Sequence, residues 1–177
     1  MFKFNNLDNT EIFNKFYKIY GNRVVSINTE INVCCSTSGK GEITNNKFTN
    51  DLIKDTPYAY NSYYNEIIKS DEVCKSCNLN NDEEMALIAH ELGHIYIAHN
   101  KIECKNEEFE ADDYVKKIGL SSHLKSALRK MLKSNISPEQ NDELQKRIER
   151  ISTISIPFII LFASFIVFLT ILIFKFY

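Results

Sequence analysis

The chain has 177 residues, of which 44% are hydrophobic and 25% are charged, and its formal net charge is −2. These averages are typical of a globular protein and exclude a disordered or collagen-like chain. Residues 151–177 hold 20 hydrophobic residues out of 27, whereas residues 1–150 carry 20 basic and 23 acidic residues. We therefore expect a folded domain over 1–150, an apolar tail over 151–177, and no binding of nucleic acid through bulk charge.

The first half of the chain predicts one helix and short strands. Apolar residues at helical spacing predict a helix over 9–20. The face that it would bury consists of Ile12, Phe13, Phe16 and Ile19. VVSINTEINV (24–33) and YYNEII (63–68) are typical of strands, because β-branched and aromatic residues are frequent in them. Residues 35–62 are rich in Ser, Thr, Asn and Gly and predict a loop with at most short strands.

The second half of the chain predicts four helices. They are expected over 79–99, over 107–118, from Ser122 to about Lys133, and from Ser137 onward. Asn81 and Glu84 have the spacing of a capping box at the start of the first of these helices. Asn106 can cap the second helix, and Gly119 can end it. Pro138 suits the first position of the fourth.

The apolar tail contains an uncharged segment, residues 154–174, that matches a bilayer in length. As a helix its 21 residues would measure about 31 Å, which is the thickness of the hydrocarbon core. The positive charges in the 21 residues before it are Lys133, Lys146, Arg147 and Arg150. Only Lys175 follows it, and the amino terminus has no signal-peptide core. The sequence therefore predicts a single-pass, tail-anchored protein whose N-terminal domain is cytoplasmic.

The sequence HELGH, residues 90–94, matches the H-E-x-x-H pattern. Two histidines at positions i and i+4 lie one above the other on a helix, so His90 and His94 can reach one metal ion. Glu91 lies at the edge of the same site, where it can take a proton from a water bound to the metal. We therefore expect His90 and His94 to be metal ligands and Glu91 to be the general base.

A carboxylate-rich helix follows the motif and offers a third ligand. Glu108 and Asp112 are four residues apart and share a face, so a two-helix hairpin would bring Glu108 to the metal. Two histidines and one glutamate are a catalytic zinc set, because the fourth position stays open for water. Asp112 would accept a hydrogen bond from a ligating histidine. Glu110, two residues from Glu108 and on another face, is the competing ligand.

HELGH together with EFEAD, residues 108–112, resembles the gluzincin metallopeptidases of the HtpX and CAAX prenyl protease type. The similarity extends over about residues 55–133. It implies a zincin-like, mainly helical α+β domain with a small edge sheet that holds the substrate in extended form. It also implies one Zn²⁺ per chain, with His90, His94 and Glu108 as ligands and Glu91 as catalytic base. The ImmA/IrrE type of cytoplasmic peptidase, which also has HELGH, is a second resemblance.

Other residues have weaker claims to a role in the chemistry. His99 lies about 140° from the ligand face, so we expect it to interact with the helix dipole. His123 and Tyr114 are candidates for stabilising an oxyanion, although core packing is the simpler interpretation of Tyr114. Cys74 and Cys77 have zinc-knuckle spacing, but free thiols are favoured over a structural metal or redox role.

These patterns together predict a membrane-anchored zinc endopeptidase. Its partners would be a protein or peptide substrate at the membrane and the lipid bilayer, the latter through residues 154–174. The alternatives are a regulatory peptidase of the ImmA/IrrE type that cleaves a repressor-like protein, and a membrane protein that binds a metal or a partner without catalysis. Glu91 favours catalysis, because a purely structural zinc site does not need an acid beside its ligands.

Overall fold

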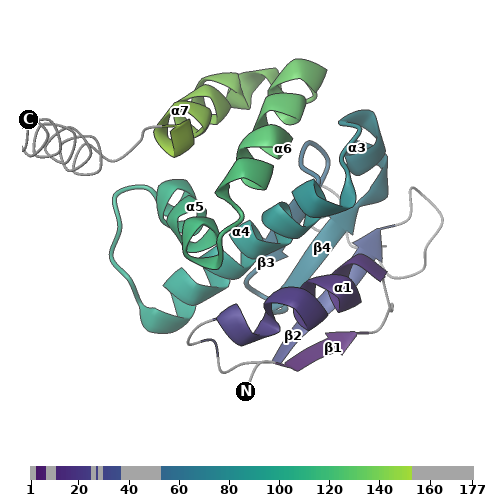
Figure 1. The fold of residues 1–177 in the computed structure, drawn as a ribbon, viewed down its shortest axis with the longest axis vertical. Coiled ribbons are helices and arrows are strands. Elements are labelled where there is room, and N and C mark those ends of the chain that lie inside the picture. The colour runs from purple at the N-terminus through teal and green to yellow at the C-terminus, as the bar shows by residue number, and fades with distance from the viewer. Residues whose placement is uncertain (1–2, 7–10, 25–26, 28–29, 37–52, 153–177) are drawn as a thin grey trace, which may run out of the picture.

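The structure of the chain is a computed structural model that describes residues 3–6, 11–24, 27, 30–36 and 53–152. It is mainly helical with one four-stranded sheet, which confirms the expected α+β class (Figure 1). Across these described ranges, no helix combines the length and the apolar character that a membrane crossing requires. The segment 154–174 lies outside them, so the membrane span stays a prediction.

The sheet has the strand order β1-β2-β4-β3. Its strands are β1 (Lys3–Asn6), β2 (Glu30–Ser36), β3 (Tyr58–Asn61) and β4 (Glu66–Ser70). β2 is parallel to both β1 and β4, whereas β3 forms an antiparallel hairpin with β4 in which Tyr60 lies opposite Ile67. Ile67 joins the main core, and its neighbour Ile68 packs with Ala59 in a second cluster, because successive side chains point to opposite faces. β3 is an edge of the described sheet.

Two helices, α1 (Glu11–Tyr20) and α4 (Asn81–Asn100), lie across one face of this sheet (Figure 1). Phe13 of α1 meets Tyr58 of β3 edge to face, with ring centroids 6.0 Å apart. α4 is buried on nearly every side, since every residue from Glu83 to Gly93 is buried. A helix surrounded in this way belongs to the centre of the fold. The H-E-x-x-H motif is therefore carried by the most enclosed helix of the described chain.

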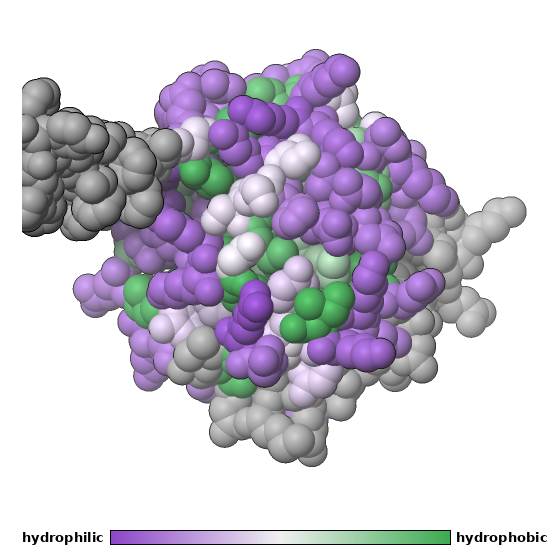
Figure 2. All heavy atoms as spheres, viewed as in Figure 1, coloured by the Kyte–Doolittle hydropathy of each residue, from purple (hydrophilic) through white to green (hydrophobic). Residues whose placement is uncertain are grey.

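Of the remaining helices, α5 and α6 pack on α4, and α7 packs on α5 and α6; Figure 1 shows these three on the side of α4 away from the sheet. The remaining helices are α3 (Asp71–Ser76), α5 (Glu107–Ile118), α6 (Ser121–Ser134) and α7 (Asn141–Ser152), with 3₁₀ turns η1 (Gly21–Arg23) and η3 (Pro138–Gln140). α4 and α5 form the expected hairpin. On the face of the molecule in Figure 2, hydrophilic side chains predominate and hydrophobic ones form small patches between them.

Several boundaries differ from the sequence predictions for local reasons. The capping box of α4 uses Asn80 and Glu83, one residue before the predicted pair, because Asn and Glu each occur twice in succession here. β2 begins at Glu30, six residues after the predicted start of that strand. The prediction that Ile19 is buried was wrong, since it is 46% exposed near the end of α1. Ser137 precedes a 3₁₀ turn and makes no side-chain cap.

Candidate metal centre

Two capped helices place the three predicted ligands. On α4, the Asn80 side chain accepts a hydrogen bond from the Glu83 N–H at 2.9 Å, and the Glu83 carboxylate accepts one from the Asn80 N–H at 2.8 Å. On α5, Asn106 accepts from the Phe109 N–H at 2.9 Å, and Gly119 ends the helix in the left-handed conformation with φ of 91°. Local sequence therefore fixes the start of α4 and both ends of α5. For α5, the capping residues are those that the sequence predicted.

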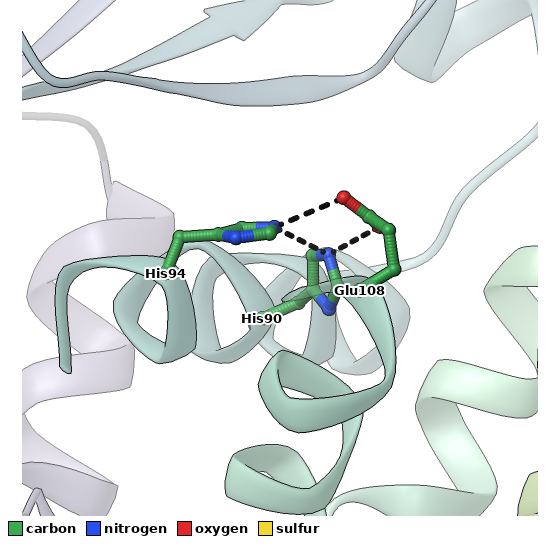
Figure 3. Close-up of side chains that lie close together, drawn as sticks. All are labelled: His90, His94 and Glu108. Atoms are coloured by element: carbon green, nitrogen blue, oxygen red, sulfur yellow. Dashed lines mark hydrogen bonds and ion pairs between the residues drawn. The ribbon is translucent and has the colours of Figure 1, made fainter. Parts of the chain in front are cut away.

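The side chains of His90, His94 and Glu108 point toward one another across these helices (Figure 3). The Nε2 atoms of His90 and His94 are 3.1 Å apart. The two Glu108 carboxylate oxygens lie 3.1 Å from Nε2 of His90 and 3.3 Å from Nε2 of His94. Ligands bonded tetrahedrally to zinc at about 2.0–2.1 Å stand about 3.3–3.4 Å from each other. The donor set and its spacing therefore fit a zinc ion.

A close approach of the two helix backbones makes this convergence possible. A Cβ atom added to Gly93 would lie 2.7 Å from Cα and 2.9 Å from the carbonyl oxygen of Ala111. Carbon atoms that are not bonded pack at about 3.5–4.0 Å, so no larger residue fits at position 93 without a shift of the backbone. Gly93, between the two histidines, and Ala111, three residues after Glu108, thus set the distance between the ligand helices.

Asp112 occupies the position predicted for it, beside the candidate ligand His90. Its carboxylate lies 3.0 Å from Nδ1 of His90, and the side chain is only 1% exposed. A carboxylate at Nδ1 orients the imidazole so that Nε2 faces the ligand cluster. Glu110, the competing ligand, is exposed, whereas Glu108 lies in the cluster. The geometry favours Glu108 over Glu110.

Arg147 of α7 completes the cluster and was not predicted. Its Nη1 donates to Glu108 at 2.7 Å, and its Nε and Nη2 donate to the two Asp112 oxygens at 3.0 and 2.8 Å. The guanidinium also lies 3.2 and 3.3 Å from the ring nitrogens of His90. In the sequence Arg147 appeared only as one of the positive charges that flank the tail. The signal that could have revealed it is the helical period, since Leu144, Arg147 and Ile148 form the buried side of α7.

The buried charges of the cluster balance one another. Burial and the Arg147 charge lower the pKa of His90, but hydrogen bonds with Asp112 and Glu108 outweigh them and raise this pKa to about 9. Burial raises the pKa of Glu108, yet hydrogen bonds from His90 and His94 and the Arg147 charge hold it well below its usual range. The pKa of Asp112 is lowered in the same way, against burial, by His90 and Arg147. Both carboxylates are therefore anionic at neutral pH.

The cluster opens into a cavity of about 460 Å³, a size typical of sites that bind small molecules or side chains. Glu91 lines this cavity with His90 and His94, and Glu91 itself is only 7% exposed. Residues of the edge strand β3 form part of the wall, including Tyr58 and Tyr60. The predicted base, the ligand set and an edge strand thus face one cavity.

The weaker candidates lie elsewhere. His99 is exposed near the end of α4, and neither His123 nor Tyr114 is among the residues that line the cavity. Tyr114 is buried and packs on Tyr96 with ring centroids 5.3 Å apart, in keeping with a role in the core. Cys74 and Cys77 are buried and form no disulfide with another described residue. Cys74 lies in α3 and Cys77 directly follows that helix, and neither belongs to the group of His90, His94 and Glu108.

No family model matches the chain, and comparisons with curated proteins and with solved structures give no match either. Any proposal about function therefore rests on the sequence motif and the geometry of this site.

Proposed function

We propose that the chain is a zinc-dependent endopeptidase of the zincin type and that this cavity is its active site. The observation that carries the proposal is the convergence of Nε2 of His90, Nε2 of His94 and the Glu108 carboxylate within 3.1–3.3 Å, with Glu91 facing the same cavity. Two imidazoles and one carboxylate leave a fourth tetrahedral position open, which distinguishes catalytic from structural zinc sites.

A zinc ion held by His90, His94 and Glu108 would lower the pKa of a bound water toward neutrality and polarise the scissile carbonyl. Glu91 would accept the proton of the attacking water on its carboxylate and pass it to the nitrogen of the leaving amine. Asp112 would hold His90 through Nδ1, and Arg147 would hold both Asp112 and Glu108. The backbone of β3 would pair with an extended substrate, because an edge strand offers N–H and C=O groups to a further strand.

The proposal includes the membrane attachment predicted from residues 154–174, with the catalytic domain on the cytoplasmic side. The support is the length and apolar character of that segment. Alkaline extraction of membranes and a reporter fused to either end test this part separately. Release of the chain by alkali would overturn it.

The test of the activity is the zinc content and the peptide cleavage of the wild type and of Glu91→Gln. The full-length protein is purified in detergent and loaded with zinc, and a mixed library of quenched fluorescent peptides reports cleavage. We expect Glu91→Gln to keep about one zinc per chain and to lose cleavage by at least about 100-fold, the size of a general-base contribution. Glu110→Gln, an exposed glutamate in the other ligand helix, is the matched control and should cleave normally. Equal cleavage by wild type and Glu91→Gln would overturn the proposal.

A further inference from the structure

One continuous stretch of the chain carries positive charge without negative charge. Residues 114–138 contain six lysines and arginines and no aspartate or glutamate. The stretch includes α6, and among the α-helices in the described ranges only α6 has no acidic residue. Residues 1–150 as a whole carry 20 basic and 23 acidic residues, so this positive charge is a local feature of the surface that the net charge does not reveal.

Three of these charges form a stripe along α6, and we call Lys125, Arg129 and Lys133 the basic stripe. They follow one another at intervals of four residues, so they share one face of the helix and extend over about 12 Å. Arg129 and Lys133 are exposed, and Lys125 is partly exposed. Lys130 of the same helix pairs with Glu83 at 2.7 Å, whereas the basic stripe forms no ion pair with the other described residues. Its positive charge is therefore uncompensated.

The basic stripe lies close to the point where the predicted membrane segment begins. α7 ends at Ser152, and the apolar segment begins at residue 154. Two steps along a chain span at most about 7 Å, so a bilayer crossed by residues 154–174 would have its surface at the end of α7. α6 packs directly on α7 (Figure 1), and packed helices have axes about 8–10 Å apart. This distance brings α6 beside the lipid headgroups.

The other basic residues before the apolar segment are less available than the basic stripe. Arg147 is buried in the candidate metal centre, where it binds two carboxylates. Arg150 is paired with Asp113. Lys146 is exposed, but the exposed side of α7 carries charges of both signs, since it also includes Asp142, Glu143 and Glu149. Next to α7, the uncompensated positive surface is therefore the basic stripe of α6.

From this arrangement, we infer that the basic stripe binds the headgroups of anionic lipids at the membrane surface. The inference rests on the proposed membrane attachment and not on the peptidase activity. Lipid phosphate and carboxylate groups complement lysine and arginine side chains, and each basic residue near an anionic surface adds to the affinity. Because α6 packs on both α4 and α7, this contact fixes the rotation of the domain about its tail and the direction in which the metal cavity faces.

Lysine acetylation followed by mass spectrometry measures this contact on the full-length protein. The protein is placed in nanodiscs of phosphatidylcholine, or of phosphatidylcholine with a third of the lipid replaced by phosphatidylserine, and a water-soluble reagent modifies its lysines. We expect Lys125 and Lys133 to react at least about 5-fold more slowly in the anionic discs, since one basic residue near an anionic surface gains about that factor in affinity. Lys15 and Lys18 of α1, exposed on the other side of α4, are internal controls and should react equally in both discs (Figure 1).

A matched pair of variants tests the stripe itself. Arg129→Glu reverses the central charge and leaves Lys125 and Lys133 as reporters, and it should remove their protection by phosphatidylserine. Lys15→Glu makes the same kind of charge change on an exposed residue of α1 and should leave the protection intact. Thermal unfolding shows that each variant is folded. Molar salt should also remove the protection in the wild type, because it screens charges beyond about 3 Å.

Equal reaction of Lys125 and Lys133 in the two kinds of disc would overturn the inference, as would the same protection in Arg129→Glu and Lys15→Glu. Protection of these lysines by added RNA and not by phosphatidylserine would assign the surface to nucleic acid and overturn it as well. Alkaline extraction tests the membrane attachment separately. If alkali releases the chain, the inference is decided by flotation of the full-length protein with vesicles of the same two compositions, in which flotation with the anionic vesicles alone supports lipid binding and equal behaviour with both contradicts it. Peptide cleavage enters none of these measurements, so failure of the peptidase function stays distinguishable.

Discussion

The two halves of α4 both bury charged side chains, but they surround them differently. In its first turn, Glu83 pairs with Lys130 at 2.7 Å and Glu84 pairs with Lys69 at 2.8 Å. Hydroxyl groups of Ser126 and Tyr58 complete these pairs. Each carboxylate there has its own cation, which is the arrangement that makes a buried charge tolerable.

Around the second half of α4, the charged groups do not form separate pairs of one carboxylate and one cation. Glu108, Asp112 and His90 share the single guanidinium of Arg147, and His94 adds a further donor atom. The groups also face a cavity, whereas neither Glu83 nor Glu84 is among the residues lining it. Burial of charge alone therefore does not mark a functional site. The proposed site rests instead on the convergence of several candidate ligand atoms at one cavity.

The difference between the two halves of α4 predicts a large loss of stability when Arg147 is removed. In the metal-free protein, Arg147→Met removes the guanidinium from the buried Asp112 carboxylate and from the partly exposed Glu108 carboxylate, and we expect a loss of about 3–5 kcal/mol in the free energy of unfolding, mainly from Asp112. Zinc should restore part of this loss, because the ion brings positive charge to Glu108. Chemical denaturation with and without zinc measures both effects. A loss that zinc leaves unchanged would contradict a metal site at this cluster.

In the first turn of α4, which does not line the cavity, the change comparable to Arg147→Met is Glu83→Gln. Burial alone would raise the pKa of Glu83, but hydrogen bonds from Lys130, the Asn80 N–H and Ser126 lower it. A lowered pKa in the folded state means stabilisation that is present above the unfolded pKa, about 4.3, and lost as the pH falls through the folded pKa. We expect Glu83→Gln to cost about 1.5–3 kcal/mol at pH 7 and progressively less below about pH 4. Zinc should not alter this cost, as denaturation at both pH values can show.

The contact between the ligand helices can be tested with Gly93→Ala. Helix propensity predicts stabilisation by about 1 kcal/mol, because alanine favours a helix over glycine. The 2.7 Å approach to Ala111 predicts the opposite, a loss of about 1–3 kcal/mol with weaker zinc binding. Thermal unfolding and a zinc titration measure the two quantities. A more stable variant with unchanged zinc affinity would show that the helices are not held at this distance.

The smallest effect is expected for Arg150→Met. Arg150 also joins α7 to α5, through Asp113, but its side chain is 36% exposed and that of Asp113 is 35% exposed. Ion pairs in such solvent-accessible positions contribute about 0–1 kcal/mol. Denaturation should therefore give a loss far below that of Arg147→Met. Equal losses for the two arginines would mean that burial of the cluster is not what sets its energetics.

Much of the ligand arrangement could be predicted because it depends on short-range patterns. Asn106 and Gly119 fixed the limits of α5, and the four-residue spacing of His90 and His94 put both rings on one side of α4. Asp112 followed from its helical spacing with Glu108. All of these inferences use the period of a helix and the chemistry of its ends, which act within a few residues.

Arg147 could not be predicted in the same way. It is 39 residues from Glu108 in the sequence, and only the packing of α7 on α5 brings them together. Its charge also fits the pattern of basic residues that precede a membrane segment, which explains Arg147 in the sequence without any role in the metal cluster. The order of the strands and the placement of β3 at the cavity likewise depend on long-range contacts that no local pattern encodes.

Binding of one zinc ion by His90, His94 and Glu108 can be measured as the zinc content of three purified proteins. Wild type, Glu108→Ala and Glu110→Ala are loaded with zinc, freed of excess metal and measured by elemental analysis together with protein concentration. The geometry predicts about one zinc per chain in the wild type and in Glu110→Ala, and a clear loss in Glu108→Ala, because the Glu108 carboxylate meets the two histidines whereas Glu110 is exposed and outside this group. Equal zinc in Glu108→Ala and wild type, or a loss in Glu110→Ala instead, would contradict it.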